Sequence, residues 1–151
     1  MKEVTGDLLQ LAREGKFDVI IHGCNCYCTM GGGIAKVIKA QFPEAFAADK
    51  ETVSGEKSKL GSYTKARVER DGVSFTIVNA YTQFDWRGNG LKADYDAIEK
   101  AFAGIRQEFA GLRIAYPLVG AGLANGDWAR IALIIDQELD GMDHTLVRLP
   151  G

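Results

Sequence analysis

The segment from Asp18 to Ala35 constrains the fold of this chain more than any other. It begins as a nearly continuous apolar run, which is typical of a strand covered on both faces, and it continues into the triplet Gly31–Gly33. The spacing of Ile34, Val37 and Ile38 then predicts a helix. Glycines at such a junction let the backbone approach a ligand, and the loop N–H groups and the helix N-terminus together form an anion-binding concavity. The segment therefore predicts a nucleotide or phosphate site.

A second glycine-rich loop lies at Gly120–Gly126, and Asp127 can cap the helix that follows it. Both loops follow an expected strand and precede an expected helix. In open α/β sheets ligands bind at that edge, so the two loops are expected to close over one ligand. The triplet Gly31–Gly33 does not have the spacing of a dinucleotide fingerprint, and it is not part of a Walker loop.

Strands alternate with helices along the rest of the chain. This order predicts an α/β domain with a mixed sheet, and Asp71-Gly72 predicts the turn of one antiparallel hairpin. We expect helices at 7–13, 33–42, 43–53, 94–109 and 127–139, and strands ending near Val4 and at 17–23, 60–69, 73–80, 113–119 and 145–149.

Length and charge limit the possible functions. The 151 residues are expected to form a single domain, and a formal net charge of -2 argues against a surface built mainly to hold bare nucleic acid. No apolar run reaches the roughly 18 residues of a membrane span, so no membrane association is expected. The first residues lack the apolar stretch of a signal peptide, and cytoplasmic residence is therefore expected.

His22, Cys24, Cys26 and Cys28 are spaced by two residues, which raises the question of a metal site. Residues on one face of a strand sit roughly 7 Å apart, and no second cluster of ligands exists, so we expect reduced, buried thiols and no metal. His22 has two interpretations: a core histidine with a satisfied hydrogen bond, or a proton shuttle or nucleophile close to Asn25.

Other polar and aromatic residues also allow two interpretations. Asp7 is either a charge that favours a helix N-terminus or an acceptor for an exocyclic amine such as that of adenine. Phe84 and Trp86 lie in a polar loop, where they either stack on a base or ribose or pack locally.

Taken in order, four segments resemble the macrodomain, an ADP-ribose-binding module. They are Gly6–Leu8, the strand 18–25, the loop Met30–Ala35, and Pro117–Leu123 with its continuation to Trp128. The resemblance implies a three-layer α/β/α fold with a central mixed sheet over residues 1–151. It also implies ADP-ribose or a derivative as the ligand, with no cofactor.

The resemblance further implies how the ligand is bound. Asp7 would accept a hydrogen bond from the adenine amine, with the backbone of Leu8 alongside, and Asn25 would face the distal ribose. The remaining implied contacts are Gly31, Gly32, Gly33 and Ile34 along the distal ribose and diphosphate, and Gly120, Ala121, Gly122 and Leu123 around the diphosphate.

Two branches of the family are most similar. The ADP-ribose 1''-phosphate phosphatase branch resembles the chain from Ile21 to Ala35, and it implies a catalytic role for His22. The terminal ADP-ribose-glutamate hydrolases use a lysine and an aspartate, whose positions fall on Gln83 and Ala124. We therefore expect hydrolysis of ADP-ribose 1''-phosphate.

Two alternatives remain open. One is removal of ADP-ribose from a modified protein or nucleic acid, with Asn25 orienting a water and Asp127 or Asp85 acting as the base. The other is a reader that binds ADP-ribose without catalysis.

Overall fold

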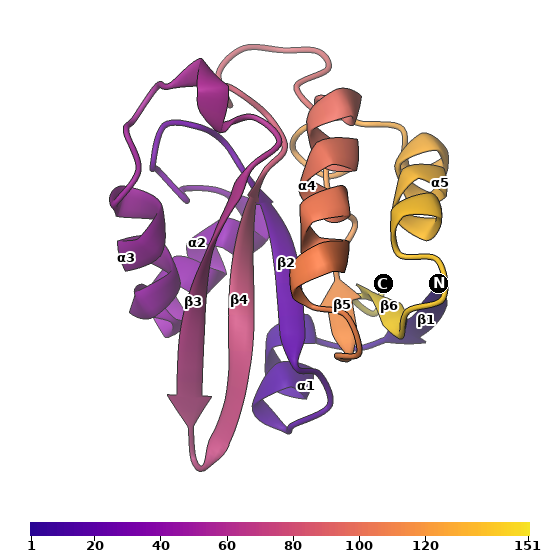
Figure 1. Cartoon of the computed structure of the whole chain (residues 1–151). Coiled ribbons are helices and arrows are strands. Elements are labelled where there is room, and N and C mark those ends of the chain that lie inside the picture. The colour runs from indigo at the N-terminus through magenta and orange to yellow at the C-terminus, as the bar shows by residue number, and fades with distance from the viewer.

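The computed structural model describes residues 1–151 and has one central sheet (Figure 1). Six strands are arranged in the order β1-β6-β5-β2-β4-β3. Only β3 runs antiparallel to its neighbour, β4, so the expected mixed sheet with one hairpin is confirmed. The strands are β1 (Lys2–Thr5), β2 (Val19–Cys24), β3 (Tyr63–Arg70), β4 (Val73–Tyr81), β5 (Ile114–Tyr116) and β6 (His144–Arg148).

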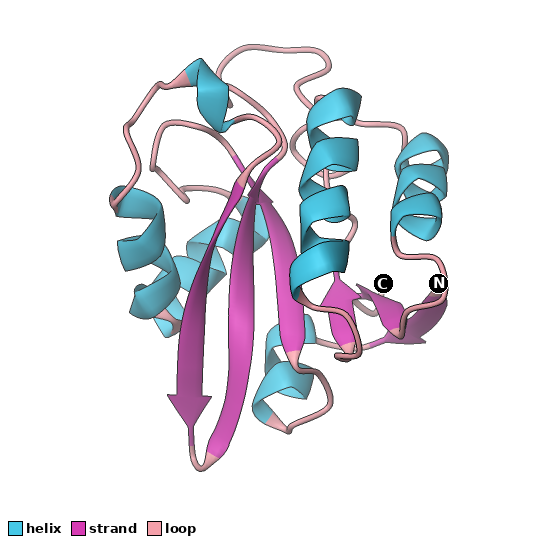
Figure 2. Ribbon diagram, in the orientation of Figure 1, coloured by secondary structure: helices cyan, strands magenta, loops and turns pink.

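Helices cover both faces of this sheet, as Figure 2 shows. The helices are α1 (Leu8–Arg13), α2 (Gly33–Gln41), α3 (Pro43–Lys50), α4 (Tyr95–Glu108) and α5 (Trp128–Glu138). The first three pack on one face of the sheet, and α4 and α5 pack on the other. The three-layer α/β/α fold is therefore confirmed. No helix is long and apolar enough to span a bilayer.

The central strand β2 contributes to both layers of the core. Val19 and Ile21 pack with α4 and α5, whereas Ile20 and Cys24 pack with α1, α2 and α3. Because successive side chains of a strand point to opposite faces, a strand between two helical layers needs apolar residues at nearly every position. This explains the continuous apolar run in the sequence.

Three element boundaries differ from the sequence-based expectation. Strand β3 begins at Tyr63 rather than at residue 60, because a 3₁₀ turn precedes it and Gly61 has a φ of 83°, in the left-handed region. Helix α3 ends at Lys50 rather than near residue 53, because the Thr52 hydroxyl donates to the Asp49 carbonyl at 2.6 Å and competes with the helical pattern. Strand β5 ends at Tyr116, well before residue 119, because Pro117 has no N–H to donate to a neighbouring strand.

The topology brings several connecting loops to one edge of the sheet. Since β2, β4 and β5 are parallel, the segments after their carboxyl ends lie on the same side. These segments are 25–32, 82–94 and 117–127, and they gather at the upper end of the sheet in Figure 1. Both glycine-rich loops belong to this group.

Candidate functional site

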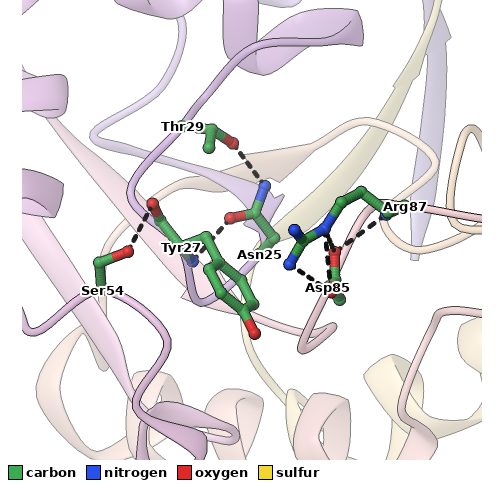
Figure 3. Close-up of polar contacts among 6 residues, drawn as sticks. All are labelled: Asn25, Tyr27, Thr29, Ser54, Asp85 and Arg87. Atoms are coloured by element: carbon green, nitrogen blue, oxygen red, sulfur yellow. Dashed lines mark hydrogen bonds and ion pairs between the residues drawn. The ribbon is translucent and has the colours of Figure 1, made fainter.

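The loop after β2 is shaped by the side chain of Asn25 (Figure 3). Its Oδ1 accepts a hydrogen bond from the N–H of Tyr27 at 2.8 Å, and its Nδ2 donates to Oγ1 of Thr29 at 2.7 Å. Ser54 donates to the carbonyl oxygen of Tyr27 at 3.0 Å, which fastens the loop from the other side. One N–H and one lone pair of the Asn25 amide remain available to a ligand.

The glycines that follow present unused backbone donors. The N–H groups of Gly31, Gly32 and Gly33 make no hydrogen bond within the protein. Gly33 is also the first residue of α2, so these donors lie at the positive end of a helix dipole. An anion at this position would be stabilised by both effects.

The second glycine loop is closed by its own backbone and tied to the segment before α4. The N–H of Gly126 donates to the carbonyl of Gly120 at 2.7 Å, and the carbonyl of Ala124 accepts from Lys92 and Ala93 at 2.8 and 3.1 Å. The N–H groups of Gly122 and Leu123 remain without a partner in the protein. This loop therefore also offers backbone donors, held in a fixed frame.

The two glycine loops meet through one side chain. The Cδ1 atom of Leu123 would lie 3.0 Å from a Cβ built on Gly32, and 3.5 Å from one built on Gly33. Leu123 is nevertheless 72% exposed, so its contacts leave most of the side chain free. Residues about 90 positions apart thus place two sets of free amides beside each other. We call this arrangement, Gly31–Gly33 with Gly120–Leu123, the cradle.

Aromatic side chains and an ion pair border the loop after β2. The Tyr27 ring lies 5.2 Å from Phe84 and 5.7 Å from Trp86, measured between ring centroids. Arg87 makes a bidentate ion pair with Asp85, drawn in Figure 3, and its guanidinium lies 5.0 Å from the centroid of the Tyr27 ring. Because Arg87 donates to it, the Asp85 carboxyl has its pKa lowered to about 2.

Comparison with known proteins identifies the family. The model of the Macro domain family matches residues 21–135, which is most of the chain. The chain belongs to the macro domain family. The matched region includes both glycine loops, most of β2 and the whole of β3, β4 and β5.

Individual relatives and structures agree with this assignment. The chain is 34% identical over 141 residues to an uncharacterized 17.5 kDa protein of Enterobacteria phage T4, covering 90% of this chain and 88% of the relative. It is 46% identical over only 46 residues to the ADP-ribose 1''-phosphate phosphatase of Aspergillus oryzae, which is 30% of this chain and 21% of that protein.

Among solved structures, the macrodomain of Mycobacterium tuberculosis DarG is similar with a TM-score of 0.75 and 22% identity, covering 99% of this chain and 97% of that one. The structure of Thermosipho africanus DarTG in complex with ADP-ribose is similar over 99% of this chain and 42% of the DarTG chain, with a TM-score of 0.72 and 18% identity. These matches show the same fold.

His22 does not reach the cradle of this macro domain. Its ring is 1% exposed, and Nε2 lies 2.7 Å from Oδ1 of Asn79, its partner across β2 and β4. Burial lowers the pKa of His22 to about 4, although the hydrogen bond to Asn79 opposes this shift. The ring is therefore neutral near pH 7, and the structure matches its interpretation as a core histidine with a satisfied hydrogen bond.

The two aspartates of the expected site both cap helices. Asp7 Oδ1 accepts from the N–H groups of Leu9 and Gln10 at 3.0 and 3.2 Å, and Asp127 Oδ1 accepts from Ala129 at 3.0 Å. The second carboxylate oxygen of each residue makes no hydrogen bond in the protein. Asp7 is not in contact with the cradle: it lines a separate polar hollow of about 440 Å³ with Gln10, Arg13, Glu14 and Gln41.

A buried polar cluster beneath the loop after β2 was missed by the sequence analysis. Lys59 is only 8% exposed, and its ammonium donates to the carbonyls of Cys26 and Val53 at 2.9 and 3.2 Å. Nearby, Asp49 accepts from the Tyr81 hydroxyl at 2.8 Å, and burial raises the pKa of this carboxyl. Lys59 lies in a charged, glycine-flanked segment, so no sequence pattern distinguishes it from exposed lysines.

Proposed function

We propose that this macro domain binds ADP-ribose across its two glycine loops and hydrolyses ADP-ribose 1''-phosphate to ADP-ribose and inorganic phosphate. The contact between Leu123 and Gly32 carries this proposal, because it brings two separate sets of unpaired backbone donors to one place. A diphosphate has oxygens on both sides and is the group that such an arrangement fits.

The binding part of the proposal rests on charge and position. Free amides and the N-terminus of α2 supply a positive potential without any lysine or arginine in the cradle. The structure of Thermosipho africanus DarTG, which has the same fold, was solved in complex with ADP-ribose. We assign the diphosphate to Gly31, Gly32, Gly122 and Leu123, with Gly33, Ile34, Gly120 and Ala121 alongside.

The adenine would lie toward Asp7. Strands β6 and β5 separate β1 from β2, so Asp7 and the loop after β2 are about 14 Å apart across the sheet at roughly 4.8 Å per strand. An extended nucleotide diphosphate sugar can bridge such a distance. The free Oδ2 of Asp7 would accept from the adenine amine, while Oδ1 continues to cap α1 beside Leu8.

In the proposed reaction, a water molecule and the Asn25 side chain act at the distal ribose. A water attacks the phosphorus of the 1''-phosphate, the bond from phosphorus to the ribose oxygen breaks, and that oxygen leaves with the sugar and takes up a proton. The free N–H of Asn25 orients the reacting group, and loop amides stabilise the charge that develops on the phosphoryl oxygens. The local similarity to the Aspergillus oryzae phosphatase supports this activity.

His22 would take no part in bond breaking, because its buried ring faces Asn79. We propose that it acts through the strand, by holding β2 against β4 so that Asn25 is placed correctly. Asp127 would hold the start of α5, and so the second loop, through its capping hydrogen bond.

Removal of ADP-ribose from a modified protein or nucleic acid is the second candidate. It is favoured by the open border of the site, where Trp86 is 44% exposed beside Tyr27 and leaves room for a large attached group. In that reaction Asn25 would orient a water toward the anomeric carbon, with Asp127 or Asp85 as the nearby carboxylate.

Calorimetry and phosphate release test the proposal together. We expect ADP-ribose to bind and wild-type protein to release phosphate from ADP-ribose 1''-phosphate. Asn25→Ala should abolish turnover, whereas Thr29→Val, which removes only the loop partner of Asn25, should retain much of it.

The other possible outcomes have distinct meanings. Absence of binding would overturn the whole proposal. Binding without phosphate release, combined with release of ADP-ribose from a modified glutamate peptide or thymidine oligonucleotide, would select the second candidate. No turnover at all would indicate a reader.

A further inference from the structure

A cysteine and a lysine lie in contact just outside the cradle. The Nζ of Lys59 is 3.5 Å from the Sγ of Cys28, in the loop that leads to Gly31–Gly33. Lys59 ends a 3₁₀ turn (η1, Lys57–Lys59) that connects α3 to β3. We propose that peroxide oxidation joins these two side chains covalently, through a bond between the Cys28 sulfur and the Lys59 nitrogen.

Both reacting atoms are held in place. Lys59 reaches Cys28 with its ammonium fixed on the carbonyls of Cys26 and Val53. The sulfur of Cys28 is fixed by the carbonyl of Asp49 and the hydroxyl of Thr52, each at 3.2 Å. Two reactants held in contact need little further ordering to react.

The other two cysteines are poorly suited to this chemistry. Cys24 and Cys26 are buried, and desolvation raises the pKa of Cys24 and raises that of Cys26 to about 11. Neither sulfur has a hydrogen bond to an amine, since Cys24 lies beside His22 and Cys26 donates to the carbonyl of Gln83. Cys28 is partly exposed, so a small oxidant can reach it.

The reaction balances with one equivalent of hydrogen peroxide. The Cys28 thiolate attacks one peroxide oxygen and the O–O bond breaks, which leaves a sulfenic acid on the sulfur. The departing hydroxide takes a proton from the Lys59 ammonium and becomes the first water. The neutral amine of Lys59 then attacks the sulfur, the S–O bond breaks, and the departing hydroxide takes a proton from the nitrogen to give the second water. Overall, a thiol, an amine and peroxide give the S–N bond and two waters. An added thiol breaks the S–N bond and restores the thiol of Cys28 and the amine of Lys59. The added thiol is itself oxidised to a disulfide.

The bond would connect the base of one cradle loop to the segment between α3 and β3. Cys26, Cys28 and the glycines belong to one continuous loop, so the bond would fix that loop on a neighbour that it already touches through Lys59. This inference concerns the chemistry of the loop and does not depend on which ligand the cradle binds.

The test treats the whole protein with hydrogen peroxide, blocks the remaining thiols, and maps the digested peptides by mass spectrometry. We expect one peptide pair that joins Cys28 to Lys59, lighter than its parts by two hydrogen atoms and separated again by dithiothreitol. Because the wild-type map identifies both joined residues, it decides the question even if a variant of Lys59 fails to fold.

Matched variants test whether these two residues, and not another cysteine or another amine, form the bond. Lys59→Arg and Cys28→Ser should lose the product completely, and Cys26→Ser should keep it. Persistence of a joined pair in Lys59→Arg would assign the bond to another amine, loss in Cys26→Ser would assign it to another sulfur, and either result would overturn the proposal. A joined pair that carries an additional oxygen would also overturn the direct bond, and so would wild-type protein that yields no joined pair.

Discussion

Leu123 lies across Gly32, with its Cδ1 atom 3.0 Å from the position that a Cβ on Gly32 would occupy. One loop follows β5 and the other follows β2, so adjacent parallel strands bring them together. The contact is made by the end of a flexible, mostly exposed side chain rather than by backbone. The distance between the two sets of free amides can therefore adjust to a bound group without disturbing the sheet.

Leu123→Ala should weaken ligand binding but leave the fold intact. An exposed side chain contributes little to stability, so the free energy of unfolding should change by no more than about 0.5 kcal/mol. Loss of apolar cover over the bound diphosphate should cost about 1 kcal/mol, or roughly fivefold in the dissociation constant of ADP-ribose. Calorimetry would measure this change. Leu133→Ala, a similarly exposed leucine on α5, should bind as the wild type does; equal losses in both variants would show that the effect is not specific to the cradle.

Two glycines of the second loop should respond differently to alanine. A Cβ on Gly126 would overlap the carbonyl oxygen of Gly120 and lie 2.8 Å from Cδ1 of Ile131, whereas nothing lies within 4 Å of one on Gly122. Gly126→Ala should therefore lose about 1–3 kcal/mol of unfolding free energy in urea titration, as expected for overpacking. Gly122→Ala should keep wild-type stability and lose affinity for ADP-ribose, because its methyl group enters the cradle. Full affinity in a folded Gly122→Ala protein would place the diphosphate elsewhere.

Most of the fold could be predicted because its signals are local. The spacing of Ile98, Phe102 and Ile105 indicated α4, and Asp71-Gly72 indicated the hairpin of β3 and β4. The end of α3 could not be predicted in the same way, because it depends on a side-chain hydrogen bond within the turn, from Thr52 to Asp49. The order of the strands also lies outside local patterns, since pairing joins residues far apart in the chain.

The candidate site was only partly accessible to sequence reasoning. Glycines at strand ends marked both loops, and the structure brings these loops together at Leu123. The environment of His22 depends on Asn79, which is 57 residues away, so sequence spacing could not decide between a core histidine and a catalytic one, and the structure has a buried pair. Lys59 was missed for the same reason, because two of its partners, Cys26 and Cys28, lie on a different loop.

Asp7 offers a test that separates helix capping from ligand recognition. Asp7→Ser keeps a side-chain oxygen at the N-cap of α1 but removes the charge and the second oxygen, whereas Asp7→Ala removes both functions. Stability should fall by about 1 kcal/mol in the alanine variant and stay near wild type in the serine variant. Both variants should lose a charge-assisted hydrogen bond to the adenine amine, worth roughly 1.5–3 kcal/mol in calorimetry. If Asp7→Ser bound ADP-ribose with wild-type affinity, Asp7 would cap α1 but would not contact the adenine.

His22 should make the protein less stable in mild acid. Burial lowers its pKa to about 4 in the folded protein, from the usual histidine value of about 6.5. As pH falls below 6.5 the unfolded chain takes up a proton that the folded protein does not, so the free energy of unfolding decreases until the pH approaches 4. The maximal loss is about 3 kcal/mol, at roughly 1.4 kcal/mol per pH unit. Burial lowers the pKa of His144 as well, so His144 also contributes to the loss of stability in acid.

His22→Gln isolates this contribution, because an amide can still hydrogen-bond Asn79 but does not titrate. Urea unfolding at pH 7 and pH 5 should show a large loss of stability in the wild type and a clearly smaller one in the variant. Glu44 and Asp85 do not interfere, because a carboxyl with a lowered pKa loses its stabilising effect only as the pH falls below its unfolded-state pKa of about 4. At pH 7 the folded variant should also retain phosphate release, because the ring does not reach the cradle. A folded His22→Gln protein with no turnover would show that the His22 ring is needed for the reaction. An unchanged pH dependence of stability would show that other groups cause the acid sensitivity.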